Sequence, residues 1–133
     1  MYVRIKKNKL HCYVCVEESD HETMNIVGYF LTDDVRRVGG QKWIKFILKS
    51  PYQDCTSNYS FLEKENGNIV LGCIFDEDPY DRALTVPIPV MIDLLEQWDM
   101  ICTMNPDEVI ITYNQGKFHV EGKITQACKE AAN

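Results

Sequence analysis

The chain has 133 residues, of which 45% are hydrophobic, and this is enough apolar material for one domain with one core. Its 14 basic and 20 acidic residues give a formal net charge of −6, which argues against binding to nucleic acid or to an anionic membrane. The longest apolar run, at 69–75, is far shorter than the roughly 18 residues of a membrane span, and the N-terminus does not resemble a secretory signal, so we expect a cytoplasmic protein.

The first sixteen residues have the alternating pattern of a β-hairpin. Val3 and Ile5 alternate with polar neighbours, and after the turn Lys7-Asn8-Lys9 the alternation resumes as far as Val16. On this pattern His11 lies on the outward face of the second strand.

Two short apolar segments follow in the N-terminal half. The segment IVGYFLT at 26–32 predicts a strand, because most of its residues are β-branched or aromatic. In QKWIKFILK at 41–49, the spacing of Lys42, Lys45 and Lys49 places all three lysines on one side of a helix. We therefore predict a short helix at 41–49, with a strand as the alternative.

Two more hairpins have clear turn signals. Between 59 and 75, two apolar runs flank Asn66-Gly67, a pair that tolerates the positive φ angles of a type I′ turn. Between 107 and 122, the chain turns through Asn114-Gln115-Gly116.

The segment PVMIDLLEQWDMICTM at 89–104 predicts the main helix. It opens with proline, which is favoured in the first turn, and it ends before Asn105-Pro106. The apolar stripe consists of Met91, Leu94, Leu95, Trp98, Ile101 and Cys102. The residues expected to face water are Asp93, Glu96, Gln97 and Thr103, with Asp99 at the boundary.

Together these elements predict an α+β fold in a single domain, residues 1–133. We expect an antiparallel sheet of about six strands, covered by one main amphipathic helix at about 89–104. One or two short helices complete the fold, at 41–49 and at the C-terminal end, 124–132.

No pattern in the chain matches a metal or cofactor site, and we expect neither. In HCYVC at 11–15, the thiols of Cys12 and Cys15 point to opposite faces of a strand, so they cannot share one tetrahedral ion. The acidic sequence FDEDPYDR at 75–82 lacks the turn glycine and the closing glutamate of a calcium loop. The six cysteines lie mostly in apolar patterns, and we interpret them as reduced thiols.

Residues suited to catalysis are few. The three histidines accompany no nucleophile motif, no phosphate-binding loop and no metalloprotease motif. His11 and His119 are both expected on outward strand faces, where two histidines that met near a cation would permit a ribonuclease-like reaction. We favour the simpler interpretation of two solvent-facing histidines, and we expect no enzymatic activity and no small-molecule substrate.

Charge is distributed unevenly along the chain. Between 35 and 53 there are five basic residues and no acid, whereas between 54 and 113 twelve acids accompany only two bases. The second segment therefore has a net charge of −10, and a field of this sign attracts a basic protein. The simplest alternative is that the acids only keep the protein soluble. A second alternative is that the protein binds nucleic acid, and the basic stretch at 36–49 would then be the binding site.

A small α+β domain with an acidic helix face, without catalytic motifs and with the strand sequence NPDEVIITYNQGKFHVEG at 105–122 resembles the immunity proteins of bacterial polymorphic-toxin and contact-dependent inhibition systems. The resemblance lies mainly in residues 85–122. It implies a partner, a cognate toxin domain that is often a basic nuclease, neutralised by direct binding.

We expect the partner contacts to be carboxylates that stand in for substrate phosphates, together with one aromatic anchor. The candidate residues are Asp76, Glu77, Asp78, Tyr80 and Asp81 from the acidic loop, and Glu96 and Asp99 from the helix. The alternatives are a small hydrolase or ribonuclease that uses His11 and His119, and a nucleic-acid adaptor that uses the stretch at 36–49.

Overall fold

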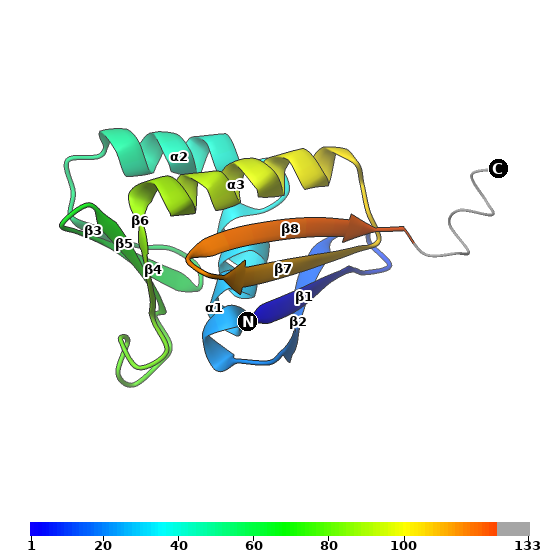
Figure 1. Ribbon diagram of the computed structural model, residues 1–133, viewed down its shortest axis with the longest axis horizontal. Helices are drawn as coiled ribbons and strands as arrows, with labels where there is room; N and C mark the ends of the chain where they lie inside the picture. Colours follow the sequence, from blue (N-terminus) through cyan, green and yellow to red (C-terminus); the bar gives the residue numbers. More distant parts are fainter. Residues whose placement is uncertain (125–133) are drawn as a thin grey trace.

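The structure is a computed structural model, in which residues 1–124 are described. The elements in chain order are β1 (Tyr2–Lys7), β2 (Tyr13–Ser19), α1 (Glu22–Tyr29), the π-helix η1 (Phe30–Val35), α2 (Gly40–Lys49), β3 (Asp54–Thr56), β4 (Ser60–Glu65), β5 (Asn68–Cys73), β6 (Leu84–Pro87), α3 (Ile88–Thr103), β7 (Glu108–Asn114) and β8 (Lys117–Lys123). The strands form two antiparallel four-stranded sheets, in the orders β2-β1-β7-β8 and β3-β4-β5-β6 (Figure 1). The predicted α+β class is confirmed, but the strands divide between two sheets.

The three predicted hairpins are all present. Asn66 and Gly67 join β4 to β5 with φ angles of 50° and 82°, as the type I′ prediction requires. Gln115 and Gly116 join β7 to β8 in the same way, with φ angles of 52° and 77°. In the N-terminal hairpin, β2 begins only at Tyr13, so His11 lies in the turn and not in the strand.

The prediction of a strand at 26–32 is wrong. This segment forms the end of α1 and the first half of η1, and five of the eight residues of α1 are buried. The reason is its position, because α1 contacts β1 and β2 of one sheet and β5 of the other. A helix buried on most sides has no polar face, and its short apolar run cannot be distinguished from a strand by periodicity. The helix begins after His21, whose Nδ1 accepts a hydrogen bond from Thr23 N at 3.1 Å.

The predicted helices at 41–49 and 89–104 are confirmed as α2 and α3, which pack side by side (Figure 1). Five residues of the predicted α3 stripe are buried, and Ile101 is half-buried against them. The prediction that Gln97 faces water is wrong, because its side chain is half-buried against β8. Its Nε2 donates to Phe118 O at 2.9 Å and its Oε1 accepts from Val120 N at 3.0 Å, because β8 is an edge strand with backbone groups that lack a neighbouring strand.

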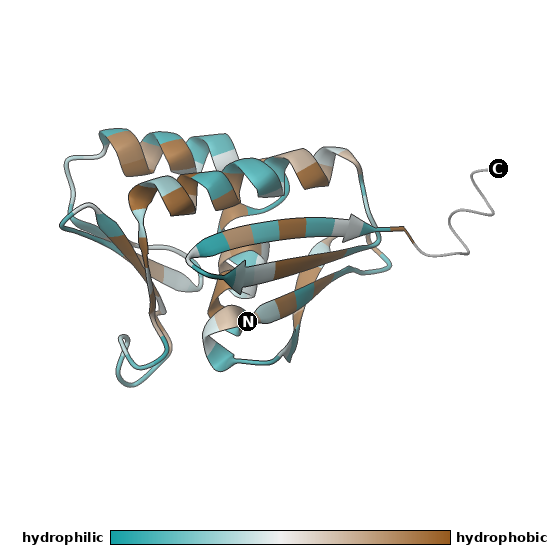
Figure 2. Ribbon diagram, in the orientation of Figure 1, coloured by the Kyte–Doolittle hydropathy of each residue, from teal (hydrophilic) through white to brown (hydrophobic). Residues whose placement is uncertain are grey.

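A continuous hydrophobic cluster joins the two sheets through α1 and α3. It contains Val3 and Ile5 of β1, Ile69 and Leu71 of β5, and the fully buried Trp98 of α3. Figure 2 shows apolar residues along the strands of both sheets and along α3. No helix within residues 1–124 is long and apolar enough to cross a membrane. The C-terminal helix expected at 124–132 lies, apart from Ile124, outside the described residues.

Candidate acidic interaction site

The acidic loop between β5 and β6 folds back over the outer face of the second sheet. The Tyr80 ring packs against Phe61 of β4, edge to face, with the ring centroids 5.5 Å apart. Gly72 of β5 makes this approach possible, because a Cβ at this position would collide with the Phe61 ring and lie 2.5 Å from Pro79 O. The loop is therefore supported by the sheet.

An ion pair closes the base of this loop. Arg82 donates to both carboxylate oxygens of Asp76, at 2.9 and 2.8 Å. The hydrogen bonds from Arg82 lower the pKa of Asp76 and are the largest cause of its shift. Asp78 adds a local turn, since its Oδ1 accepts from Tyr80 N at 3.0 Å. Asp76, a predicted partner contact, is thus already paired, and its role in the structure is to hold the loop.

Carboxylates from β3 and β4 lie around Tyr80. The Tyr80 hydroxyl donates to Glu63 Oε2 at 2.7 Å. This hydrogen bond raises the pKa of Tyr80, and the charges of Glu63, Glu65 and Asp54 raise it further. Asp54 is also the direct cross-strand partner of Glu63. We call Asp54, Glu63, Glu65, Glu77, Asp78, Tyr80 and Asp81 the acidic surface.

Between residues 54 and 113 the two basic residues are Lys64 and Arg82, and neither neutralises the acidic surface. Lys64 donates to Ser50 O at 2.8 Å, and its Nζ lies 5.5 Å from the centroid of the Phe46 ring of α2. It therefore points away from the strand face that carries Glu63. Arg82 is occupied by Asp76. The negative charge around Tyr80 is consequently uncompensated by these two residues.

The acidic surface also has an aromatic anchor and a hollow. Tyr80 is 58% exposed. A cleft of about 370 Å³ lies between β3, β4 and Tyr80, and its walls include Asp54, Glu63 and Phe61. Carboxylates beside aromatic rings suit the ammonium or guanidinium group of a partner's side chain.

The two helix candidates lie apart from the acidic surface. The loop is at one end of β6 and α3 starts at the other, and Figure 1 shows the loop and α3 on opposite sides of the molecule. Glu96 is exposed, whereas Asp99 is half-buried and accepts hydrogen bonds from Gly40 N at 3.0 Å and Gln41 N at 3.1 Å. Asp99 therefore caps the start of α2.

Asp54, Glu63 and Glu65 were missed as candidates from the sequence. The spacing of Glu63 and Glu65 does contain a signal, because residues two apart share a strand face. What the sequence does not contain is the return of the loop onto that face.

The structure does not bring His11 and His119 together. His119 is paired with Thr112, which is paired with Tyr2, whereas His11 lies in the turn beyond Lys7. Five residues of β1 therefore separate the two histidines, about 17 Å along the strands. This separation contradicts the ribonuclease-like alternative, which requires both side chains on one substrate.

The three lysines of the basic stretch, Lys42, Lys45 and Lys49, are all exposed on α2, as the helical spacing predicted.

No group of three potential metal ligands occurs within residues 1–124. No protein family model, curated protein or solved structure matches the chain.

Proposed function

We propose that this protein is a cytoplasmic inhibitor of the immunity-protein kind, which neutralises a cognate basic toxin domain by binding it through the acidic surface. The observation that carries this proposal is the concentration of uncompensated carboxylates around the exposed ring of Tyr80. An aromatic anchor inside a charged rim is the arrangement in which single residues dominate binding energy. The partner would present lysine or arginine side chains, as nucleases do for their substrate phosphates.

The cross-strand pair of Asp54 and Glu63 supports a binding role for the surface. Like charges directly opposite each other in a sheet destabilise it, by about 0.2–1 kcal/mol. A partner with positive charge would relieve this repulsion upon binding, so the pair costs stability only in the free protein. A surface that served solubility alone would not need two carboxylates at this spacing.

The rigidity of the loop also supports tight binding. Its contacts with Gly72 and Phe61 and the Asp76–Arg82 pair hold Tyr80 in place before a partner arrives. A pre-organised loop loses less conformational entropy upon binding than a free one. The field of the acidic surface would in addition raise the association rate, by about one to three orders of magnitude at low salt.

The proposal is tested with two variants of equal charge. The first replaces Glu77, Asp78 and Asp81 of the loop with alanine. The second replaces Asp93, Glu96 and Glu121, which are exposed and lie outside the acidic surface. Immobilised wild-type protein is used to capture partners from cells of the source organism, and the captured proteins are quantified by mass spectrometry for all three baits.

We expect the wild type and the second variant to capture the same basic protein domain. The loop variant should capture much less of it. Expressed alone, this domain should arrest growth, and co-expression of the wild-type chain should restore it. A domain captured equally by both variants, or one without toxicity, would count against the proposal.

A further inference from the structure

A second cleft lies between the β1–β2 turn, the η1–α2 connection and α3. Its volume is about 270 Å³, and its lining includes His11, Tyr13, Thr32, Arg36, Arg37 and Trp98. Three of these side chains are basic, and no acidic residue of the described chain lines the cleft. In a chain with a net charge of −6, such a cleft is a local site of positive potential.

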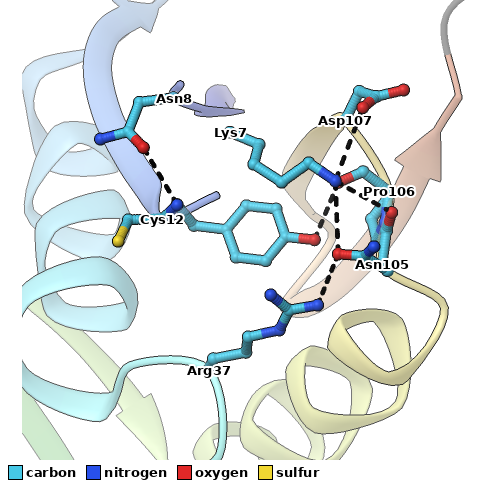
Figure 3. A network of polar contacts seen from close by, with 8 residues as sticks. Lys7, Asn8, Cys12, Arg37, Asn105, Pro106 and Asp107 are labelled. Carbon is cyan, nitrogen blue, oxygen red and sulfur yellow. Dashed lines mark hydrogen bonds and ion pairs between the residues drawn. The ribbon is translucent and has the colours of Figure 1, made fainter. Parts of the chain in front are cut away.

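The guanidinium group of Arg37 is already positioned. It donates to Asn105 Oδ1, and its central carbon lies 5.5 Å from the centroid of the Tyr13 ring. Asn105 is held in turn by Lys7, whose Nζ donates to Asn105 Oδ1 at 3.3 Å and forms an ion pair with Asp107 at 3.6 Å (Figure 3). Since a guanidinium group has five N–H donors, Arg37 retains donors for a ligand.

The charges of the two arginines are not neutralised by ion pairs. The ion pairs found within residues 1–124 include neither Arg36 nor Arg37. Asp33 lies near Arg36, but the contact of Arg36 Nε is with the backbone carbonyl of Asp33, at 3.4 Å, and Oδ1 of Asp33 accepts a hydrogen bond from the Thr32 hydroxyl at 3.4 Å. The guanidinium groups of Arg36 and Arg37, which both line the cleft, therefore remain able to bind an anion.

A pair of aromatic rings, Tyr13 in front of Trp98, lies at the base of the cleft. Tyr13 and Trp98 are buried and meet edge to face, with centroids 5.8 Å apart. The indole Nε1 of Trp98 donates to Arg36 O at 2.8 Å, and the Tyr13 hydroxyl donates to Pro106 O at 2.8 Å. The polar atoms of both rings are thus satisfied within the protein. Trp98 is fully buried and supports the Tyr13 ring, and the exposed part of Tyr13 is the aromatic surface that remains for a ligand.

The backbone supports the same assignment. Arg36 has φ 63° and ψ −172°, a region that is essentially restricted to glycine and costs about 1–3 kcal/mol for other residues. His11, which also lines the cleft, has φ 62°. Two of the three basic residues of the cleft are thus placed there by backbone conformations that non-glycine residues rarely adopt.

We infer that this cleft binds a small ligand in which a carboxylate or phosphate group is attached to a flat apolar body. Arg36 and Arg37 hold the oxyanion by charge-assisted hydrogen bonds, and His11 lies within the same lining. Tyr13, backed by the buried Trp98, contacts the apolar body. This site does not depend on the proposed toxin-binding function, because the acidic surface belongs to the other sheet.

The probes are phenyl phosphate, benzoate and neutral phenol, titrated into the isotopically labelled full chain and followed by amide chemical shifts. We expect saturable shifts around residues 11–13 and 36–37 with phenyl phosphate or benzoate, at a dissociation constant of about 1 mM or tighter. The tighter of the two identifies the preferred oxyanion. Phenol binding as tightly as both anions, or no saturable shifts with either anion, would overturn the assignment.

The variant Arg36→Gln removes one charge from the cleft, and Lys9→Gln removes one from the adjacent turn as a matched control. The first should weaken binding of the anion by about tenfold, and the second by less than about twofold. If Arg36→Gln does not fold, Arg36→Gly removes the same side chain with a residue suited to its φ angle. Equal binding by the cleft variant and the Lys9 control would refute the role of Arg36.

Discussion

Asp99 is the residue whose structural role can be tested most sharply. Its two carboxylate oxygens accept hydrogen bonds from Gly40 N and Gln41 N, at 3.0 and 3.1 Å, and so cap α2 from the neighbouring helix α3. Gly40 is buried, and a Cβ at this position would collide with the Asp99 carboxylate. The capping geometry therefore depends on a glycine at position 40 and an acid at position 99.

The cost of Asp99→Ala follows from these contacts. The loss of a helix N-cap costs about 0.5–2 kcal/mol, and the loss of a negative charge beside a helix N-terminus about 0.3–1 kcal/mol. The buried amide of Gly40 would also lack a partner. We expect a decrease of about 2 kcal/mol in the free energy of unfolding, which for 133 residues lowers Tm by about 7 °C.

The measurement is urea unfolding followed by circular dichroism, with Glu96→Ala as the matched control. Glu96 is an exposed carboxylate on the same helix and has no hydrogen bond or ion pair within the described residues. Its variant should stay within about 0.5 kcal/mol of the wild type. Asp99→Asn should fall between the two, because it keeps one acceptor oxygen and loses the charge. If the alanine variants at 99 and 96 were equally stable, the capping role would be refuted.

Four further outcomes are expected. Asp54→Lys should stabilise the fold by about 0.5 kcal/mol in urea, because it faces the acid on β4 with an opposite charge; a loss of stability would contradict this. Gly72→Ala should cost about 1–3 kcal/mol by displacing the acidic loop, and unchanged stability would show that the loop is not seated on the sheet. Arg82→Ala should lower Tm at neutral pH. The pKa of Asp76 is lowered in the folded protein, so the ion pair stabilises the fold fully above the ordinary pKa of 3.8, and this stabilisation is lost as the pH falls through the folded pKa. The difference in Tm should therefore shrink as the pH falls below 3.8, and a constant difference would argue against the pair. Arg36→Gly should raise the free energy of unfolding by about 1 kcal/mol if its φ angle is strained, and a decrease would show that it is not.

The elements that the sequence predicts best are those defined by local chemistry. Asn66-Gly67 and Gln115-Gly116 form the expected turns because few residues tolerate positive φ angles. The helix at 89–104 is likewise defined by its own apolar stripe. In contrast, the segment 26–32 resembles a strand in sequence but is helical, because α1 packs between the two sheets, and this depends on the tertiary fold alone.

The candidate site could be predicted only in part, for the same reason. The loop acids are adjacent in the chain, so the sequence indicates them directly. Asp54 and Glu63 join them only because the loop returns over Gly72. Asp99 was expected at the surface boundary, which is where it lies, but its hydrogen bonds with the start of α2 join residues 59 positions apart. The cationic cleft likewise combines a turn, a helix connection and a helix that no local pattern links.

The proposed function is tested most directly by the association rate between this protein and the captured toxin domain, measured at several salt concentrations. With the loop variant at Glu77, Asp78 and Asp81, the rate at low salt should fall by about tenfold or more and its salt dependence should flatten. The variant at Asp93, Glu96 and Glu121 should retain a rate close to that of the wild type. If both variants slowed association equally, the acidic surface would not be the site of toxin binding.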